Sequence, residues 1–207
     1  MSKPPCGLSN EYWDSLSPRS KELYDLIKPL AEPAYTVDWH LGGLEKTLSD
    51  LEESVVSMGG TLELLPDFQR GHVWTESQRS AFIEYMLRNM SPGRILFNCP
   101  EWTRPSDQKG DIKPFTMQCL DGVQRLTAVR KFLADQVTVF GGIVASDLRD
   151  TPFNPFRMNY RLQVGVYEFN TRKELLQTYL SINRGGTPHS DDEIARVQGL
   201  LAQASAT

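Results

Sequence analysis

Hydrophobic residues recur along the chain at two spacings, one typical of helices and one typical of strands. Intervals of three and four residues predict helices over 18–32, 41–58, 75–90, 122–133 and 173–182, and a last helix that begins at residues 190–193. Short β-rich runs predict strands over 61–65, 94–97, 115–120, 137–140 and 161–169. Helices and strands therefore alternate through most of the chain.

Polar residues at the helix ends support these boundaries. Ser17 followed by Pro18 is a typical helix start, and Thr171 and Ser190 each begin a capping box. Gly59 and Gly60 are suited to end the second helix. Residues 1–16 carry prolines and two isolated aromatic residues, so we expect them to form a docking arm.

Composition narrows the class of protein. With 207 residues, the chain fits one domain, or one domain plus an appendage. A net charge of −4 argues against a main surface that clamps duplex DNA, although it leaves room for a local basic groove. No apolar run approaches the roughly 18 residues of a membrane span. We therefore expect a soluble, cytoplasmic protein that does not bind a membrane.

The three cysteines, Cys6, Cys99 and Cys119, have neither the spacing of a zinc site nor that of a disulfide framework. We expect reduced thiols, with Cys119 buried as a small apolar residue.

The segment from Asp121 to Arg125 is the first candidate site. A strand enters an Asp-Gly turn, and a helix begins at once with Gln124 and Arg125. Unsatisfied N–H groups at a helix start, a glycine and an arginine together favour a phosphate seat. The alternative is that the Asp-Gly pair is simply a tight link, with Arg125 solvated.

Two further loops carry unusual chemistry. Residues 67–74 contain two charges, an amide, an imidazole and two aromatic rings, although a connecting loop needs none of these. Residues 183–188 contain an arginine, a hydroxyl and two glycines, which suits either an anion seat or a helix C-cap and turn.

The order of these loops resembles one family. The series Leu-Pro-Asp-Phe-Gln-Arg-Gly-His-Val-Trp, then Leu-Asp-Gly-Val-Gln-Arg-Leu-Thr-Ala, then Ile-Asn-Arg-Gly-Gly-Thr-Pro is similar to the N-terminal domain of GmrSD-type modification-dependent restriction enzymes. That domain family, which has an Asp-Gly-Gln-Gln-Arg motif, is a branch of the ParB/sulfiredoxin superfamily. The resemblance runs from about Val37 to about Val197. It divides the chain into an N-terminal arm and helix, 1–36, and a ParB/sulfiredoxin-like domain, 37–207.

The resemblance implies an α/β (α+β) fold with a small mixed sheet flanked by helices, and a nucleotide or phosphate at the Asp-Gly turn. In such relatives the domain is thought to bind and hydrolyse nucleoside triphosphates, while an HNH-type domain cuts DNA. The resemblance also implies a set of positions that bind the nucleotide or phosphate, to which we add the neighbouring Val123 and Arg184. The full set is Gln69, Arg70, Trp74, Gly122, Val123, Gln124, Arg125, Asn183, Arg184, Gly185, Gly186 and Thr187. Val123 departs from the family, which usually has glutamine there.

Roles follow from this resemblance and from phosphate chemistry. The candidate catalytic residues are Asp121, Gln124, Arg125 and Arg70, and the cofactors expected are an NTP and Mg²⁺. The magnesium ligands would be Asp121 and Asp67. The alternative for Asp121 is a carboxylate that caps its own helix.

Other side chains have structural alternatives as well. Trp74 either stacks on a base or packs as a hydrophobic staple. His72 is either an acid–base group or a structurally bound loop histidine. No cysteine lies inside the phosphate turn, so reductase chemistry of the sulfiredoxin kind is not expected.

Two functions remain open. The chain is either an NTPase or nuclease that acts in restriction or another DNA transaction, or a non-catalytic module that senses a nucleotide or interacts with a partner. Because no HNH-like pair of histidines follows the domain, we expect nuclease activity to come from this domain or from an HNH-type partner chain. The retained polar residues favour the enzyme, whereas Val123 and the acidic charge favour the module.

Overall fold

The computed structural model describes residues 8–69, 71, 74–90, 93–107, 110–157, 160–183 and 191–205. These residues form two units that divide between Pro33 and Ala34. The prediction of a chain boundary at residues 36 and 37 lies close to this division. Each unit is described by itself.

The N-terminal unit contains two short helices, α1 (Asn10–Ser15) and α2 (Pro18–Ile27). Ser17 caps α2 as predicted, but the helix ends earlier than expected because Lys28 adopts the left-handed conformation, with φ of 49°. Helix α1 was not predicted within the arm. Its only buried residue is Trp13, whose ring packs edge-on against Tyr24 at a centroid distance of 5.7 Å.

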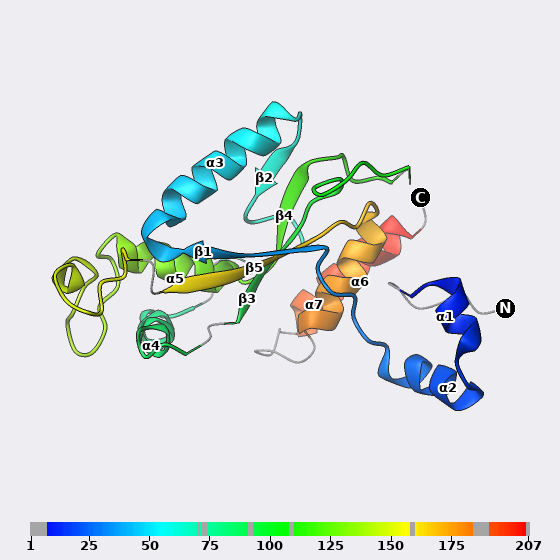
Figure 1. Cartoon of the computed structure of the whole chain (residues 1–207), viewed down its shortest axis with the longest axis horizontal. Helices are drawn as coiled ribbons and strands as arrows, with labels where there is room; N and C mark the ends of the chain where they lie inside the picture. Colours follow the sequence, from blue (N-terminus) through cyan, green and yellow to red (C-terminus); the bar gives the residue numbers. More distant parts are fainter. Residues whose placement is uncertain are drawn as a thin grey trace. The chain divides into compact units, whose positions relative to one another are not determined.

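The second unit is built on a five-stranded mixed sheet (Figure 1). Its strands are β1 (Tyr35–His40), β2 (Thr61–Glu63), β3 (Arg94–Asn98), β4 (Thr116–Asp121) and β5 (Arg161–Tyr167). The strand order is β1-β5-β3-β4-β2. The β1–β5 and β3–β4 pairs are antiparallel, and the β3–β5 and β2–β4 pairs are parallel. The predicted α/β class with a small mixed sheet is confirmed.

Five helices and two 3₁₀ turns accompany the described sheet. They are η1 (Leu41–Gly43), α3 (Leu44–Ser57), α4 (Glu76–Leu87), α5 (Val123–Leu133), η2 (Ser146–Leu148), α6 (Arg172–Asn183) and α7 (Asp191–Ala204). Helix α3 packs on β2 and β1, α4 packs on α5, and α6 packs on α7 and on β4. No helix among the described residues has both the length and the apolar character needed to cross a membrane.

The core lies between the sheet and these helices. Fully buried large side chains include Phe97 of β3, Phe132 and Leu126 of α5, and Leu162 of β5. Burial of each such side chain contributes roughly 1.5–3 kcal/mol. Strand β4 and helix α5 both contribute buried residues to this core. The core therefore fixes the two elements that flank the Asp-Gly turn.

Two elements differ from the sequence prediction. The expected strand at 137–140 is only an isolated bridge between Val139 and Ile143, because the chain reverses at once through Phe140, Gly141 and Gly142, all with positive φ. Strand β1 was not predicted. It pairs with β5 alone, and Trp39 is its only buried residue, so its hydrophobic pattern is weak.

We predict that Gly60→Ala destabilises the second unit. A Cβ at Gly60 would lie 2.0 Å from the carbonyl oxygen of Phe115, just before β4. Relief of this overlap must move backbone, which we expect to lower the free energy of unfolding by about 1–3 kcal/mol. Urea unfolding followed by circular dichroism measures the change. The matched control is Gly43→Ala, where a Cβ meets nothing within 4 Å. Equal stability of the two variants would contradict the prediction.

Candidate functional site

The β4–α5 turn begins with a glycine that no other residue can replace without strain. Gly122 is the N-cap of α5, with φ of 97°, in the left-handed region that favours glycine. A Cβ there would lie 2.7 Å from Cδ1 of Ile95 and 3.2 Å from Nη2 of Arg125. Because glycine has no side chain, no side-chain cap bonds the first-turn N–H groups of α5.

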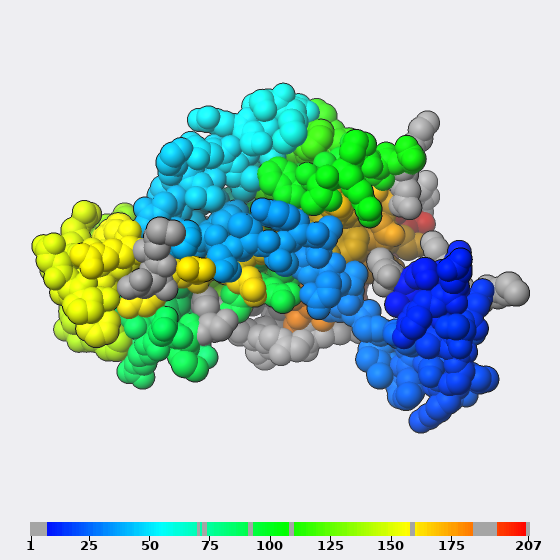
Figure 2. Space-filling model, in the orientation of Figure 1, coloured from blue at the N-terminus to red at the C-terminus, as the bar shows by residue number. Residues whose placement is uncertain are grey.

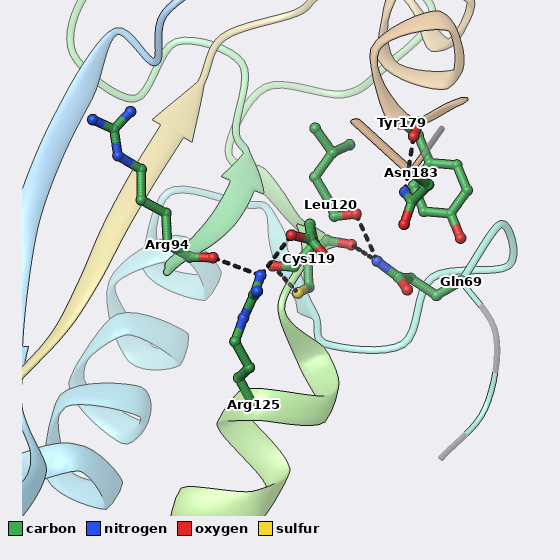
Figure 3. A network of polar contacts seen from close by, with 8 residues as sticks. Gln69, Arg94, Cys119, Leu120, Arg125, Tyr179 and Asn183 are labelled. Carbon is green, nitrogen blue, oxygen red and sulfur yellow. Dashed lines mark hydrogen bonds and ion pairs between the residues drawn. The ribbon is translucent and has the colours of Figure 1, made fainter. Parts of the chain in front are cut away.

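Arg125 is held against this turn by two acceptors (Figure 3). Its Nη2 donates to Oδ2 of Asp121 at 2.6 Å and to the carbonyl oxygen of Arg94 at 2.8 Å. A Cβ on Gly93, where φ is 77°, would lie 3.3 Å from Nη1 of Arg125. The guanidinium therefore lies between two glycines and joins β3, β4 and α5.

Asp121 is consequently an ion-pair partner and not a helix cap. The N-cap position belongs to Gly122, and Asp121 binds the side chain of Arg125 four residues later. The two side chains remain 31% and 23% exposed, respectively, so solvent and solutes still reach this pair. Nε of Arg125 is buried and has no acceptor among the described residues.

Two glutamines tie the first loop to the turn. Nε2 of Gln69 donates to the carbonyl oxygens of Cys119 and Leu120, at 3.0 and 2.8 Å (Figure 3). Gln124 is buried, and its Nε2 donates to the carbonyl oxygen of Gly71 at 2.8 Å. Its Oε1 accepts from the backbone N–H of Trp74 at 3.4 Å. The first two predicted loops thus meet through these amide groups.

The aromatic residues of the first loop pack inside the fold. Phe68 has no exposed surface, and its ring meets Tyr179 of α6 edge-on at a centroid distance of 5.2 Å. Trp74 packs on Phe82 of α4 at 5.3 Å and is partly buried against the core. This arrangement matches the packing alternative for Trp74, which directly precedes the N-cap Thr75. Because the ring of Phe68 is buried, neither of its faces is open for a nucleotide base to stack on.

Helices α6 and α7 hold the same loop from the other side. Arg172, at the start of α6, donates to Oδ2 of Asp67 at 2.5 Å. Arg196 of α7 donates to the carbonyl oxygens of Asp67 and Phe68, at 2.5 and 2.9 Å. Sequence reasoning missed both arginines, because an arginine on a helix resembles a solvated one until its long-range partner is known.

The third predicted loop follows α6. Nδ2 of Asn183, the last residue of that helix, donates to the carbonyl oxygen of Tyr179, whose ring packs on Phe68. The end of α6 therefore lies beside the first loop (Figure 3). The predicted site residues that lie outside the described residues are Arg70, Arg184, Gly185, Gly186 and Thr187, together with His72.

The two predicted magnesium ligands lie in separate ion pairs. Asp121 binds Arg125, and Asp67 binds Arg172. Among the described residues, no group of three or more histidine, cysteine or acidic side chains lies close enough to hold a metal ion. These carboxylates, as they are paired, do not fit a preformed magnesium site, and Mg²⁺ binding stays a prediction.

Val123 faces away from the ion pair. It is 5% exposed and lines a cavity of about 620 Å³ between α5 and α3, together with Leu126, Arg130 and Lys46. A longer side chain at this position, such as the glutamine expected from the resemblance, would extend toward that cavity. The substitution therefore changes the cavity wall and leaves the contacts of Arg125 intact.

Both described cysteines are buried and unsuited to act as nucleophiles. Burial, and then the nearby Asp121 carboxylate, raises the pKa of the Cys119 thiol far above its ordinary value. Burial and then Glu168 raise the pKa of Cys99 to about 12. Protonated thiols are poor nucleophiles, which agrees with the exclusion of reductase chemistry.

We predict that Gln124→Met loosens the first loop. Methionine has a similar length but cannot bond Gly71 or Trp74, so the variant leaves two backbone groups without their partner. The expected loss in free energy of unfolding is about 1–3 kcal/mol. Faster amide hydrogen exchange at Gly71 and Trp74 should accompany this loss. Gln177→Met, at an exposed position of α6, is the control and should change neither quantity. Unchanged exchange in Gln124→Met would refute this role.

We predict that the protein loses stability as the pH rises above about 9. A thiol whose pKa is raised on folding stabilises the fold below its unfolded pKa of 9.0, and this contribution disappears as the pH approaches about 12, the folded value for Cys99. Urea unfolding between pH 8 and pH 10.5 measures the slope, in a Cys6→Ser background. Cys99→Ala should reduce this dependence of the free energy of unfolding on pH. An identical slope in the two proteins would show that the Cys99 thiol does not cause it.

The comparisons with known proteins give one match. Residues 53–174, more than half of the chain, match the family described as "GmrSD restriction endonuclease, N-terminal domain". This stretch runs from α3 into α6 and includes the first loop and the β4–α5 turn. No curated protein and no solved structure matches the chain. The chain thus belongs to the family of GmrSD restriction endonuclease N-terminal domains.

Proposed function

We propose that this domain binds the phosphate groups of a nucleotide at the β4–α5 turn. Membership of the family supports a role in restriction-related DNA processing. The observation that carries the nucleotide proposal is the position of Arg125, whose guanidinium lies against Gly122, the N-cap of α5.

Three features of the turn suit an anion. The helix N-terminus carries partial positive charge, and its first N–H groups lack a side-chain cap. Gly122 lets a ligand approach the backbone closely. Arg125 adds a planar group with several donors, which binds phosphate oxygens better than a lysine does.

Binding at this turn requires a partner exchange. Asp121 is bound to Arg125, and both side chains are partly exposed. A phosphate carries more negative charge than one carboxylate, so it competes with Asp121 for the guanidinium. The Arg94 carbonyl keeps the arginine in place while this exchange takes place.

The same ion pairs favour a binding module over a phosphohydrolase. Hydrolysis of a nucleoside triphosphate usually requires carboxylates that hold Mg²⁺. Asp121 and Asp67 are each bound to an arginine, at 2.6 and 2.5 Å. We therefore propose that this chain senses or presents a nucleotide, and that hydrolysis requires Asp121 to leave Arg125.

We predict that Arg125→Ala weakens nucleotide binding by about ten- to a hundredfold, the usual effect of removing a charged hydrogen-bond donor. Isothermal titration with ATP, GTP, CTP and UTP, each with and without Mg²⁺, measures the affinity. Arg130→Ala is the matched control, because Arg130 lies on the same helix but binds Glu45. Arg125→Lys should restore part of the affinity through its charge.

Phosphate release in the same samples, with and without DNA, separates binding from hydrolysis. Binding without release by the wild type supports the module, whereas release that Arg125→Ala abolishes supports the enzyme. Wild-type protein that binds none of the four nucleotides would refute the phosphate site. Equal affinity of Arg125→Ala and Arg130→Ala would show that the nucleotide binds elsewhere.

A further inference from the structure

We propose that a second surface, the cleft at the end of α4, binds single-stranded nucleic acid. This cleft is separate from the β4–α5 turn, so the activity proposed for it is additional to nucleotide binding at the turn. It has a volume of about 750 Å³. Its lining residues come from three segments: Leu87, Arg88, Asn89, Pro152, Phe153, Tyr160 and Arg161.

A buried hydrogen bond holds the walls of the cleft together. The hydroxyl of Tyr160, which is 7% exposed, donates to the carbonyl oxygen of Leu87 at 3.3 Å. This bond joins the last residue of α4 to the residue that precedes β5. In Figure 2, α4 and the segment around residue 150 are neighbours within the second unit. The cleft therefore has fixed walls, one of them a helix end.

An exposed aromatic ring, Phe153, lies in this cleft. The side chain of Phe153 is 56% exposed, although burial would stabilise a phenylalanine by roughly 1.5–3 kcal/mol. Phe140, 45% exposed, lies nearby, with the guanidinium of Arg88 over its ring at 5.6 Å. Exposed rings next to arginines are the usual stacking platforms for unpaired bases.

The charges around the cleft suit a phosphate backbone. Among the described residues, the lining contains two arginines and no carboxylate. Arg94 of β3 lies next to Gln163, two residues beyond Arg161 on β5, and its Nε donates to Oε1 of that glutamine. Two acids approach these elements: Asp38, which is 3.4 Å from Arg161, and Glu84, whose Oε1 accepts from the N–H of Phe140. The described lining itself therefore contributes two positive side-chain charges and no negative one.

A single strand fits this surface better than a duplex. Phe153 can stack only on a base whose face is free, and a paired base is covered by its neighbours in the helix. The protein has a net charge of −4, so a long duplex would meet more acidic than basic surface. A short single strand needs only the few cations of the cleft.

Fluorescence anisotropy with a labelled 20-nucleotide oligothymidine, in low and moderate salt, tests this proposal. Phe153→Ala should weaken binding by about five- to a hundredfold, and Phe153→Trp should preserve it. Arg88→Ala and Arg161→Ala should each weaken binding and reduce its dependence on salt. The matched controls are Tyr35→Ala, another exposed aromatic residue, and Arg19→Ala, another exposed arginine. Both should bind as the wild type does.

Three outcomes would overturn the proposal. They are a wild type that oligothymidine does not saturate at any salt concentration used, a duplex of equal length that binds more tightly, and a Phe153→Ala variant that binds as the wild type does. An excess of ATP should not displace oligothymidine from the wild type, because no residue of the β4–α5 turn lines the cleft. Displacement of the oligonucleotide by ATP would assign it to the β4–α5 turn instead. Failure at the cleft and failure at the turn are thus distinguishable.

Discussion

The contacts of one guanidinium determine the geometry of the candidate site. Arg125 binds Asp121 at the end of β4 and the Arg94 carbonyl at the start of β3, and it extends from α5. It fits there because Gly93 and Gly122 have no side chains. A charged group this deep in the fold is stable only with such partners. The same contacts place the donor beside the helix N-terminus, so the structural role of Arg125 and its proposed ligand-binding role have one cause.

Gln69 of the first loop and Gln124 of the turn have a structural role, which differs from the catalytic role that their chemistry suggests. An amide side chain near a phosphate site suggests a catalytic role. Gln69 and Gln124, however, donate hydrogen bonds to backbone carbonyl groups of the turn and the loop. Buried backbone groups that lose such partners destabilise a fold. In the proposed nucleotide site, the polar contacts at the described part of the turn would therefore come from backbone N–H groups and Arg125, whose positions the glutamines help to fix.

The sequence predicted local features well and long-range partners poorly. Most helices in the second unit begin or end within a few residues of their predicted limits, because caps and apolar spacing act over a few positions. The convergence of the first loop with the Asp-Gly turn was suggested only by the family resemblance. Arg196, which binds carbonyls almost 130 residues away in the chain, left no local signal. Strand β1 was not predicted for a similar reason. Its pairing with β5 stabilises it, and its own hydrophobic pattern is weak.

Arg94 connects the two surfaces for which we propose ligands. Its carbonyl oxygen accepts from Arg125, and its side chain donates to Gln163, which lies two residues from Arg161 on β5. A phosphate that draws Arg125 away from Asp121 therefore acts on the strand beside the α4 cleft. Coupling between two sites requires an element that both ligands contact or displace, and it must be equal in both directions. Strand β3 joins the two surfaces only indirectly, through Arg125 and through β5. Oligonucleotide affinity measured with and without nucleotide therefore tells whether the two surfaces are coupled or act separately.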